Sequence, residues 1–259
     1  MLEWDPGPSA NIAAVFELAP IDEYKKKPKK FRLEWGPLYY RGRTDGSAKV
    51  LVIGQDPAAD EDVARRILVG TAGQRVQGFL SKLGITSSYI MINAFLYSIY
   101  GQFNKELRDF MDSPTVKQWN NQLLASLATA KIEAILAFGK AAEHMVTNWP
   151  GAAALEAQGR IFNLTHPTAT LKNVFQSWND NLPNIANKLS PDSDGIVNTT
   201  PYSGTKFKKT ELQRIPLRDF GFGAPDWMGT GDMAARLKKN GAVPEKTKTT
   251  STILWWALG

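Results

Sequence analysis

Four short apolar runs, each about the length of a β-strand, constrain the fold of this chain more than any other feature. They occupy residues 50–54 (VLVIG), 89–94 (YIMINA), 132–139 (IEAILAFG) and 160–165 (RIFNLT). Residues 63–83, 115–130, 140–149 and 178–189 instead repeat their apolar side chains at helical spacing. Strands that alternate with helices predict an α/β fold, here a three-layer α/β/α domain around a central four-stranded parallel sheet.

The organisation of the chain changes after residue 189. With 259 residues the chain is long for one ordinary domain and short for two. The segment from Ser190 onward is rich in Pro, Asp and Gly and shows little periodicity until residues 252–258 (TILWWAL). We therefore predict one domain over residues 1–189 and a C-terminal extension over residues 190–259 that packs on the core. The aromatic end, Trp255 and Trp256, favours this docking, and a dimer contact or a disordered tail are the alternatives.

Composition excludes several classes of protein. Cysteine is absent, which removes disulfides, thiolate catalysis and any zinc or iron–sulfur centre held by cysteine. No apolar run approaches the roughly 18 residues of a membrane-spanning helix, and the N-terminus lacks the pattern of a secretory signal. We expect a cytoplasmic protein that has no metal or other cofactor, does not insert into membranes and acts as a monomer.

Basic residues gather near the N-terminus. The net charge is +6 and the sequence pI is about 9.4, which is common among proteins that bind polyanions. One basic cluster consists of Lys25, Lys26, Lys27, Lys29, Lys30 and Arg32, and a smaller one consists of Lys206, Lys208 and Lys209. Each cluster taken singly is also compatible with a solvated loop, so charge alone leaves nucleic acid as one of two interpretations.

Polar residues stand at the carboxyl ends of three predicted strands. Asp56 follows the first strand, Asn93 ends the second and His166 follows the fourth. In open α/β sheets, ligands bind outside these strand ends. Each residue also has a local interpretation, as a turn residue, a backbone partner or a loop histidine. Their shared placement favours an active site, whereas His144, within a helical pattern, is expected to be structural.

The same residues resemble the motifs of the uracil-DNA glycosylase superfamily. Residues 54–58 read GQDPA, similar to the GQDPYH motif of one branch, while "MINA" at Asn93 and "HPT" at His166 match the second and third motifs. Residues 64–80 (ARRILVGTAGQRVQGFL) resemble the GRPFVGRAGQLLD stretch of the iron–sulfur branch. The separations of 37 and 73 residues between Asp56, Asn93 and His166 also suit that branch, so the resemblance spans residues 49–189.

The resemblance implies excision of uracil from DNA. A glycosylase of this superfamily takes the nucleotide out of the base stack before it cleaves the glycosidic bond. Asp56 would then stabilise a cationic sugar and orient a water, while His166 and the backbone N–H of Gln55 would bind uracil O2. Asn93 would recognise N3–H and O4 of uracil.

The resemblance also implies contacts with the DNA strand. Thr168 would contact phosphate, and Thr170 or Leu171 would lie nearest the residue that wedges into the vacated stack. Lys25, Lys26 and Lys27 would add phosphate contacts, so the implied partner is uracil-containing DNA, either single- or double-stranded.

Several positions depart from the family pattern. Ala58 replaces the Tyr that blocks the thymine methyl group, and Leu68 replaces the Phe that stacks on the base. Ala59 stands where the GQDPYH motif has His, and the cluster cysteines of the iron–sulfur branch are missing. These departures leave two alternatives to a monofunctional uracil-DNA glycosylase: a protein that binds DNA lesions or abasic sites with weak or lost catalysis, and an unrelated nucleotide hydrolase.

Overall fold

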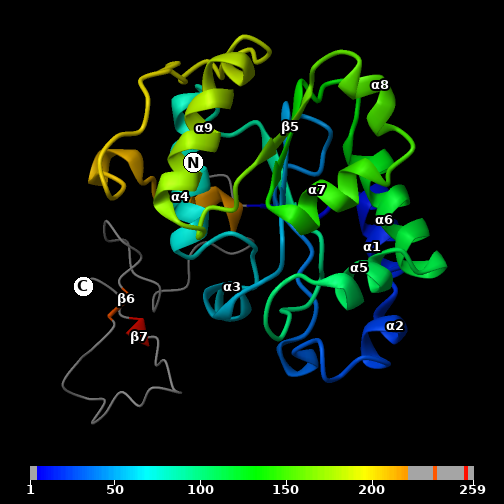
Figure 1. Cartoon of the computed structure of the whole chain (residues 1–259). Helices are drawn as coiled ribbons and strands as arrows, with labels where there is room; N and C mark the ends of the chain where they lie inside the picture. Colours follow the sequence, from blue (N-terminus) through cyan, green and yellow to red (C-terminus); the bar gives the residue numbers. More distant parts are fainter. Residues whose placement is uncertain (1–4, 221–235, 238–253, 256–259) are drawn as a thin grey trace. The chain divides into compact units, whose positions relative to one another are not determined.

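The computed structural model describes residues 5–220, 236–237 and 254–255 (Figure 1). The chain divides into two units. One is Gly7–Gln213, which contains a five-stranded sheet, and the other combines Met1–Pro6 with Arg214–Gly259. In the second unit the structure describes a short 3-10 helix, η3 (Leu217–Asp219), and two paired strands, β6 (Arg236–Leu237) and β7 (Leu254–Trp255). Trp256 and the side chain of Trp255 lie outside the described residues, so the docking of this aromatic end stays a prediction.

A five-stranded, mostly parallel sheet forms the centre of Gly7–Gln213. Its strand order is β1-β3-β2-β4-β5. The strands are β1 (Arg41–Gly42), β2 (Val50–Gly54), β3 (Tyr89–Asn93), β4 (Ala134–Phe138) and β5 (Ile161–Leu164). The four predicted strands are present and parallel, but the predicted count of four is wrong, because β1 adds an antiparallel edge beside β3. Two residues are too few to show strand periodicity.

Apolar residues cover both faces of the sheet. In β2, Leu51 and Ile53 join one hydrophobic cluster, while Val50 and Val52 join the other, as alternation along a strand requires. Helices lie on both sides of the sheet (Figure 1). The first cluster takes in α1 (Ala10–Glu17), α5 (Lys105–Met111), α6 (Pro114–Leu127) and α7 (Lys140–Thr147), and the second takes in α4 (Thr71–Lys82) and α9 (Leu171–Ala186).

The remaining elements are short. They are α2 (Ile21–Lys25), α3 (Ala59–Ala64), α8 (Ala152–Glu156), η1 (Leu33–Trp35) and η2 (Lys209–Glu211). Helix α9 begins at Leu171, seven residues before the predicted start at residue 178. The predicted start is wrong, because Leu171, Val174 and Phe175 already continue the helical spacing of Trp178 toward the N-terminus. Among the residues that the structure describes, no helix has the length and apolar character needed to cross a bilayer.

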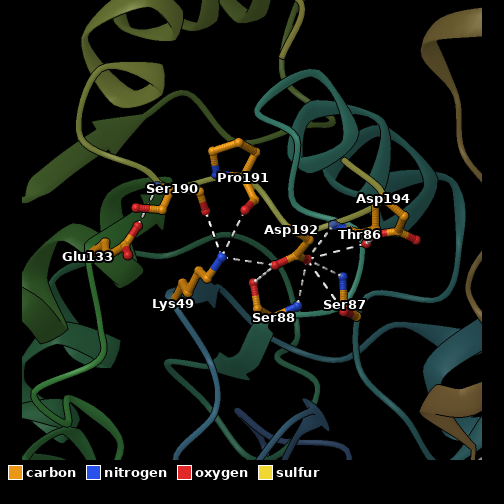
Figure 2. Close-up of polar contacts among 9 residues, drawn as sticks. All are labelled: Lys49, Thr86, Ser87, Ser88, Glu133, Ser190, Pro191, Asp192 and Asp194. Atoms are coloured by element: carbon orange, nitrogen blue, oxygen red, sulfur yellow. Dashed lines mark hydrogen bonds and ion pairs between the residues drawn. The ribbon is translucent and has the colours of Figure 1, made fainter. Parts of the chain in front are cut away.

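Residues 190–213, the first part of the predicted extension, are tied to the sheet by Asp192 (Figure 2). Its carboxylate accepts hydrogen bonds from the backbone N–H groups of Thr86, Ser87 and Ser88, at 2.8, 2.8 and 3.1 Å. Lys49 Nζ lies 3.3 Å from the same carboxylate. Because Ser88 and Lys49 immediately precede β3 and β2, this anchor lies at the amino ends of the strands, opposite the edge where ligands bind.

Aromatic packing adds a second attachment for the same segment. The rings of Tyr202 and Phe207 are buried, and their centroids both lie 5.7 Å from that of Trp178 in α9. Asn179 also exchanges two hydrogen bonds with the backbone of Tyr202. These contacts describe the segment through Gln213, and the domain boundary at residue 189 stays a prediction.

Candidate active site

The carboxyl ends of the parallel strands meet at one edge of the sheet and border a cleft. From the central strand β2, the chain adds β3 on one side and then β4 on the other. The carboxyl end of β2 therefore lies at a topological switch point, where α/β sheets bind ligands. The cleft encloses about 520 Å³, a volume in the range of small-molecule sites. Its lining comes from segments that follow β2, β4 and β5 and from the loop after β3, and it includes Gln55, Asp56, Ala58, Glu61, Leu68, Phe103, Gly139, Lys140, His166 and Thr168.

Asp56 is held at the cleft by two hydrogen bonds. Its carboxylate accepts the backbone N–H of Ile99 at 2.9 Å and the side-chain amide of Gln55 at 3.0 Å. Burial raises the pKa of Asp56 to about 6, although both hydrogen bonds oppose the shift, and the charge of Glu61 raises it further. Asp56 is therefore mostly ionised at pH 7 but is less well stabilised as an anion than an aspartate in water. A cationic partner would stabilise the ionised form of such a carboxylate.

His166 faces the same cleft as a neutral hydrogen-bond donor. The backbone N–H of Thr168 lies 3.3 Å from Nδ1, and because an amide N–H can only donate, Nδ1 accepts. The proton of the neutral ring is then on Nε2. Burial lowers the pKa of His166, which favours this neutral form at pH 7.

Two neighbours position the segment that carries His166. Arg75 of α4 donates to the carbonyl oxygen of Pro167 at 2.5 Å, which links the third motif to that helix. Gly139 has φ +91°, and a Cβ there would lie 3.1 Å from the His166 Cβ. A glycine thus permits the close approach between the end of β4 and the histidine. Neither role was visible in the sequence, because both depend on contacts between distant segments.

Asn93 lies at the end of β3 but is buried away from solvent. It is 3% exposed and does not line the cleft in this structure. Its Oδ1 packs against Gly54, where a Cβ would come within 2.4 Å, and this oxygen has no hydrogen-bond partner among the described residues. Buried acceptors without a donor are rare. This orphaned acceptor therefore fits a group that would bind a donor on a ligand.

Leu68 and Ala58, both predicted to contact the base, line the cleft and give its wall apolar surface. Leu68 is 7% exposed and has φ +53°, an unfavourable conformation for a residue with a branched side chain. A Cβ at Gly73 would overlap the carbonyl of Leu68, so Gly73 makes room for this turn. Ala58 is exposed and leaves its side of the cleft open.

Phe103 is an aromatic lining residue that the sequence did not identify. It comes from the loop after β3, is partly exposed, and packs against Phe95 with a centroid separation of 6.1 Å. Because this loop has no periodicity, an aromatic residue ten positions after Asn93 was the only available signal. The loop thus brings a ring to the cleft that Leu68 does not provide.

Glu61 is a second residue that sequence reasoning missed. Its carboxylate accepts the backbone N–H groups of Val69 and Gly70, at 3.0 and 3.1 Å, and that of Ala58 at 3.1 Å. It therefore connects the first motif to the turn that carries Leu68. Burial raises its pKa, and three backbone donors compensate part of the cost of burying this carboxyl group.

The predicted DNA-contacting residues occupy different positions. Thr168 is exposed and lines the cleft, and its hydroxyl lies 2.9 Å from His166 Nδ1. Thr170 is exposed before α9, whereas Leu171 is partly buried and packs against the core; neither lines the cleft. The roles proposed for Thr170 and Leu171 stay predictions.

The lysine cluster lies on α2 and the following turn. Lys25 and Lys26 form exposed ion pairs with Asp22 and Glu23, at 3.0 and 2.7 Å, and Lys27 is exposed. Exposed pairs of this kind are weak, so they do not prevent the lysines from exchanging partners. Their binding to DNA stays a prediction.

Within residues 5–220 and the two short strands beyond them, no three His, Asp or Glu side chains are grouped to hold a metal ion. No curated protein matches the chain in sequence. The sequence model of the Uracil DNA glycosylase superfamily, however, matches residues 42–189, which contain the strand ends and the cleft residues described above. Since this match covers more than half of the sequence, the chain belongs to the uracil DNA glycosylase superfamily.

Proposed function

We propose that this protein hydrolyses the N-glycosidic bond of deoxyuridine in DNA and leaves an abasic site. Membership of the superfamily suggests a DNA glycosylase. The observation that carries the proposed hydrolysis is the arrangement of Asp56 and His166 on one cleft, one an anion and the other a neutral donor. The target base must leave the duplex stack to reach such a cleft.

Asp56 would stabilise the sugar during bond cleavage. As the bond to the base breaks, positive charge develops at C1′ and on the ring oxygen, and a buried carboxylate interacts with that charge more strongly than one in water. The same carboxylate would orient a water for attack on C1′. The hydrogen bond from the Ile99 N–H holds the carboxylate in place while leaving it an anion.

His166 would stabilise the departing base. The uracil leaves with negative charge on its O2, and the Nε2–H of a neutral imidazole can donate to that oxygen without transferring its proton. The backbone N–H of Gln55 would donate to the same oxygen. Because Thr168 holds Nδ1 as an acceptor, the donor proton stays on Nε2, where the base can reach it.

Base selection would rest on Asn93, Ala58 and Phe103. Asn93 Oδ1 does not line the cleft in this structure, but it is unpaired and would accept N3–H of a uracil that reaches it. Cytosine has an acceptor at N3 and would leave two acceptors opposed. Ala58 is too small to block a methyl group at C5, so discrimination against thymine would be weak. Phe103 would stack on the base, because Leu68 has no aromatic ring with which to do so.

Lys140 does not argue for a lyase step, although it lines the cleft. Its side chain is 78% exposed, and Nζ lies 2.8 Å from the carboxylate of Glu143. A nucleophilic lysine has to approach C1′ of the sugar, whereas Nζ of Lys140 is engaged in this exposed ion pair. We therefore propose a monofunctional enzyme.

The test is base release from an oligonucleotide with one deoxyuridine, read on a denaturing gel with and without alkali. The wild type should give strand breaks only after alkali, Asp56→Asn should remove most activity, and the exposed Asp109→Asn should not. Tight retention of abasic DNA without base release would favour a lesion-binding protein instead. Base release only from free nucleotides would favour a nucleotide hydrolase.

A further inference from the structure

A stacked group of three side chains lies on the protein surface beside the cleft. The guanidinium of Arg32 is 4.9 Å from the ring centroid of Trp35 and 4.3 Å from that of Tyr100. Tyr100 is 40% exposed, and it is the one exposed aromatic residue among those that the structure describes in full. We call Arg32, Trp35 and Tyr100 the Tyr100 platform.

The Tyr100 platform adjoins the residues that would carry out catalysis. The residue before Tyr100, Ile99, donates its N–H to Asp56, and the three residues after it, 101–103, line the cleft. A nucleotide next to one bound in the cleft would therefore lie within reach of the Tyr100 ring.

The backbone holds the Tyr100 platform in a defined position. Phe31 and Ile99 form an antiparallel bridge. On either side of it, Tyr100 N–H donates to the Lys30 carbonyl at 2.8 Å and Arg32 N–H donates to the Ser98 carbonyl at 2.9 Å. An ordered aromatic group at a surface loses less conformational freedom on binding than a mobile one.

The surrounding charge is mixed but mostly positive. Lys27 and Lys29 are exposed on the segment that leads into Arg32, and Lys30 pairs with Glu106 at 2.6 Å. The acid that contacts the Tyr100 platform is Glu34, whose carboxylate accepts from the Tyr100 hydroxyl at 3.3 Å. A partly exposed aromatic next to cations is the combination that single-stranded nucleic acids bind, through base stacking and phosphate contacts.

We propose that the Tyr100 platform stacks on an unpaired base beside the extruded nucleotide, and that the protein therefore binds single-stranded DNA in preference to duplex. This inference rests on the proposed function, because it places the target nucleotide in the cleft. A base within a duplex is stacked on its neighbours and paired, so its face is not free to meet Tyr100. Every unpaired base has such a face, so the contact is tolerant of sequence.

The experiment measures Kd by fluorescence anisotropy for one labelled oligonucleotide, single-stranded and in duplex. The oligonucleotide carries an uncleavable 2′-fluoro-deoxyuridine. Tyr100→Ala should weaken single-strand binding about tenfold and duplex binding by less than about twofold, whereas Tyr100→Phe should bind nearly as the wild type does. Tyr100→Leu, which keeps apolar bulk without a ring, should resemble Tyr100→Ala.

Two controls separate stacking from other effects. Leu18→Ala removes an exposed apolar side chain at the end of α1, and it should leave both Kd values unchanged. Thermal unfolding of each Tyr100 variant checks that the fold is retained. Unchanged single-strand binding by Tyr100→Ala, or equal losses for single strand and duplex, would overturn the inference, as would wild-type binding by Tyr100→Leu.

The outcomes also separate this inference from the proposed function. If the wild type excises uracil but the Tyr100 variants bind DNA like the wild type, only the inference about the Tyr100 platform is refuted. If the wild type binds neither form of DNA, the proposed function and the inference fail together. The assay measures binding to an uncleavable oligonucleotide. If the protein binds DNA but does not excise uracil, the proposed function fails while the stacking role of Tyr100 can still be confirmed.

Discussion

Under the proposed function, the rate of uracil release should fall about tenfold between pH 7 and pH 5, because the role proposed for Asp56 requires its ionised form. Burial raises its pKa to about 6. A carboxyl group with that pKa is about nine-tenths ionised at pH 7 and about one-tenth ionised at pH 5. An aspartate with the usual pKa of about 3.9 would stay more than nine-tenths ionised over the same range. The fall in rate toward acid pH, which we call the acid limb of the pH profile, therefore reports the burial of Asp56.

The assay is kcat/KM for a uracil oligonucleotide from pH 4.5 to 8, because that quantity reports the ionisation of the free enzyme. Asp56→Asn should leave a residual rate that does not depend on pH in this range. His166→Asn should be slower throughout but keep the fall in rate at acid pH, since that fall is assigned to Asp56, whose pKa burial raises, whereas burial lowers the pKa of His166.

Two results would refute the reasoning about Asp56. A wild-type rate that is constant from pH 7 to pH 5 would show that Asp56 ionises at an ordinary pKa or takes no part. An acid limb that persists in Asp56→Asn would assign the limb to another group. Circular dichroism at each pH checks that the fold is intact, so that a loss of rate cannot come from unfolding.

Three other predictions concern separate parts of the molecule. Asp192→Ala should lower the free energy of unfolding by about 2 kcal/mol at pH 7, because it leaves three backbone donors without their acceptor. Although burial opposes it, hydrogen bonds from Ser88 and its neighbours hold the pKa of Asp192 well below the usual range. The carboxylate therefore stabilises the fold above about pH 4, and the difference measured by urea unfolding should shrink as the pH falls further; a difference independent of pH would contradict this. Phe103→Leu should raise KM for uracil DNA by about fivefold with a small change in kcat, if the ring contributes stacking of about 1 kcal/mol; an unchanged KM would remove Phe103 from the site. Asn93→Asp should slow uracil excision by at least about tenfold, measured beside excision of cytosine, and an unchanged rate would exclude Asn93 from base recognition.

The strands and their polar ends could be predicted because their signals are local. A buried parallel strand has an apolar run, and its carboxyl end is fixed by where that run stops. β2 was predicted with the bounds it has, and Asp56 and His166 line one cleft as their positions at strand ends indicated. Asn93 also ends its strand, but its side chain is buried, which strand position does not determine.

The cleft's loops could not be predicted, because their positions depend on packing between distant segments. Phe103 lies in an irregular loop, and Glu61 acts through hydrogen bonds to Val69 and Gly70 that no spacing rule indicates. The same holds for β1, whose two residues become a strand only through their pairing with β3.

The sequence by itself determined the α/β class, the parallel strands, the motifs that place the chain in its superfamily and the pair of Asp56 and His166. Only the tertiary structure decided the environment of that pair. Burial raises the pKa of Asp56 and lowers that of His166, and burial is a property of everything that packs around a side chain. The tertiary structure likewise placed Tyr100 beside the cleft, because the bridge between Phe31 and Ile99 joins segments that are 68 residues apart.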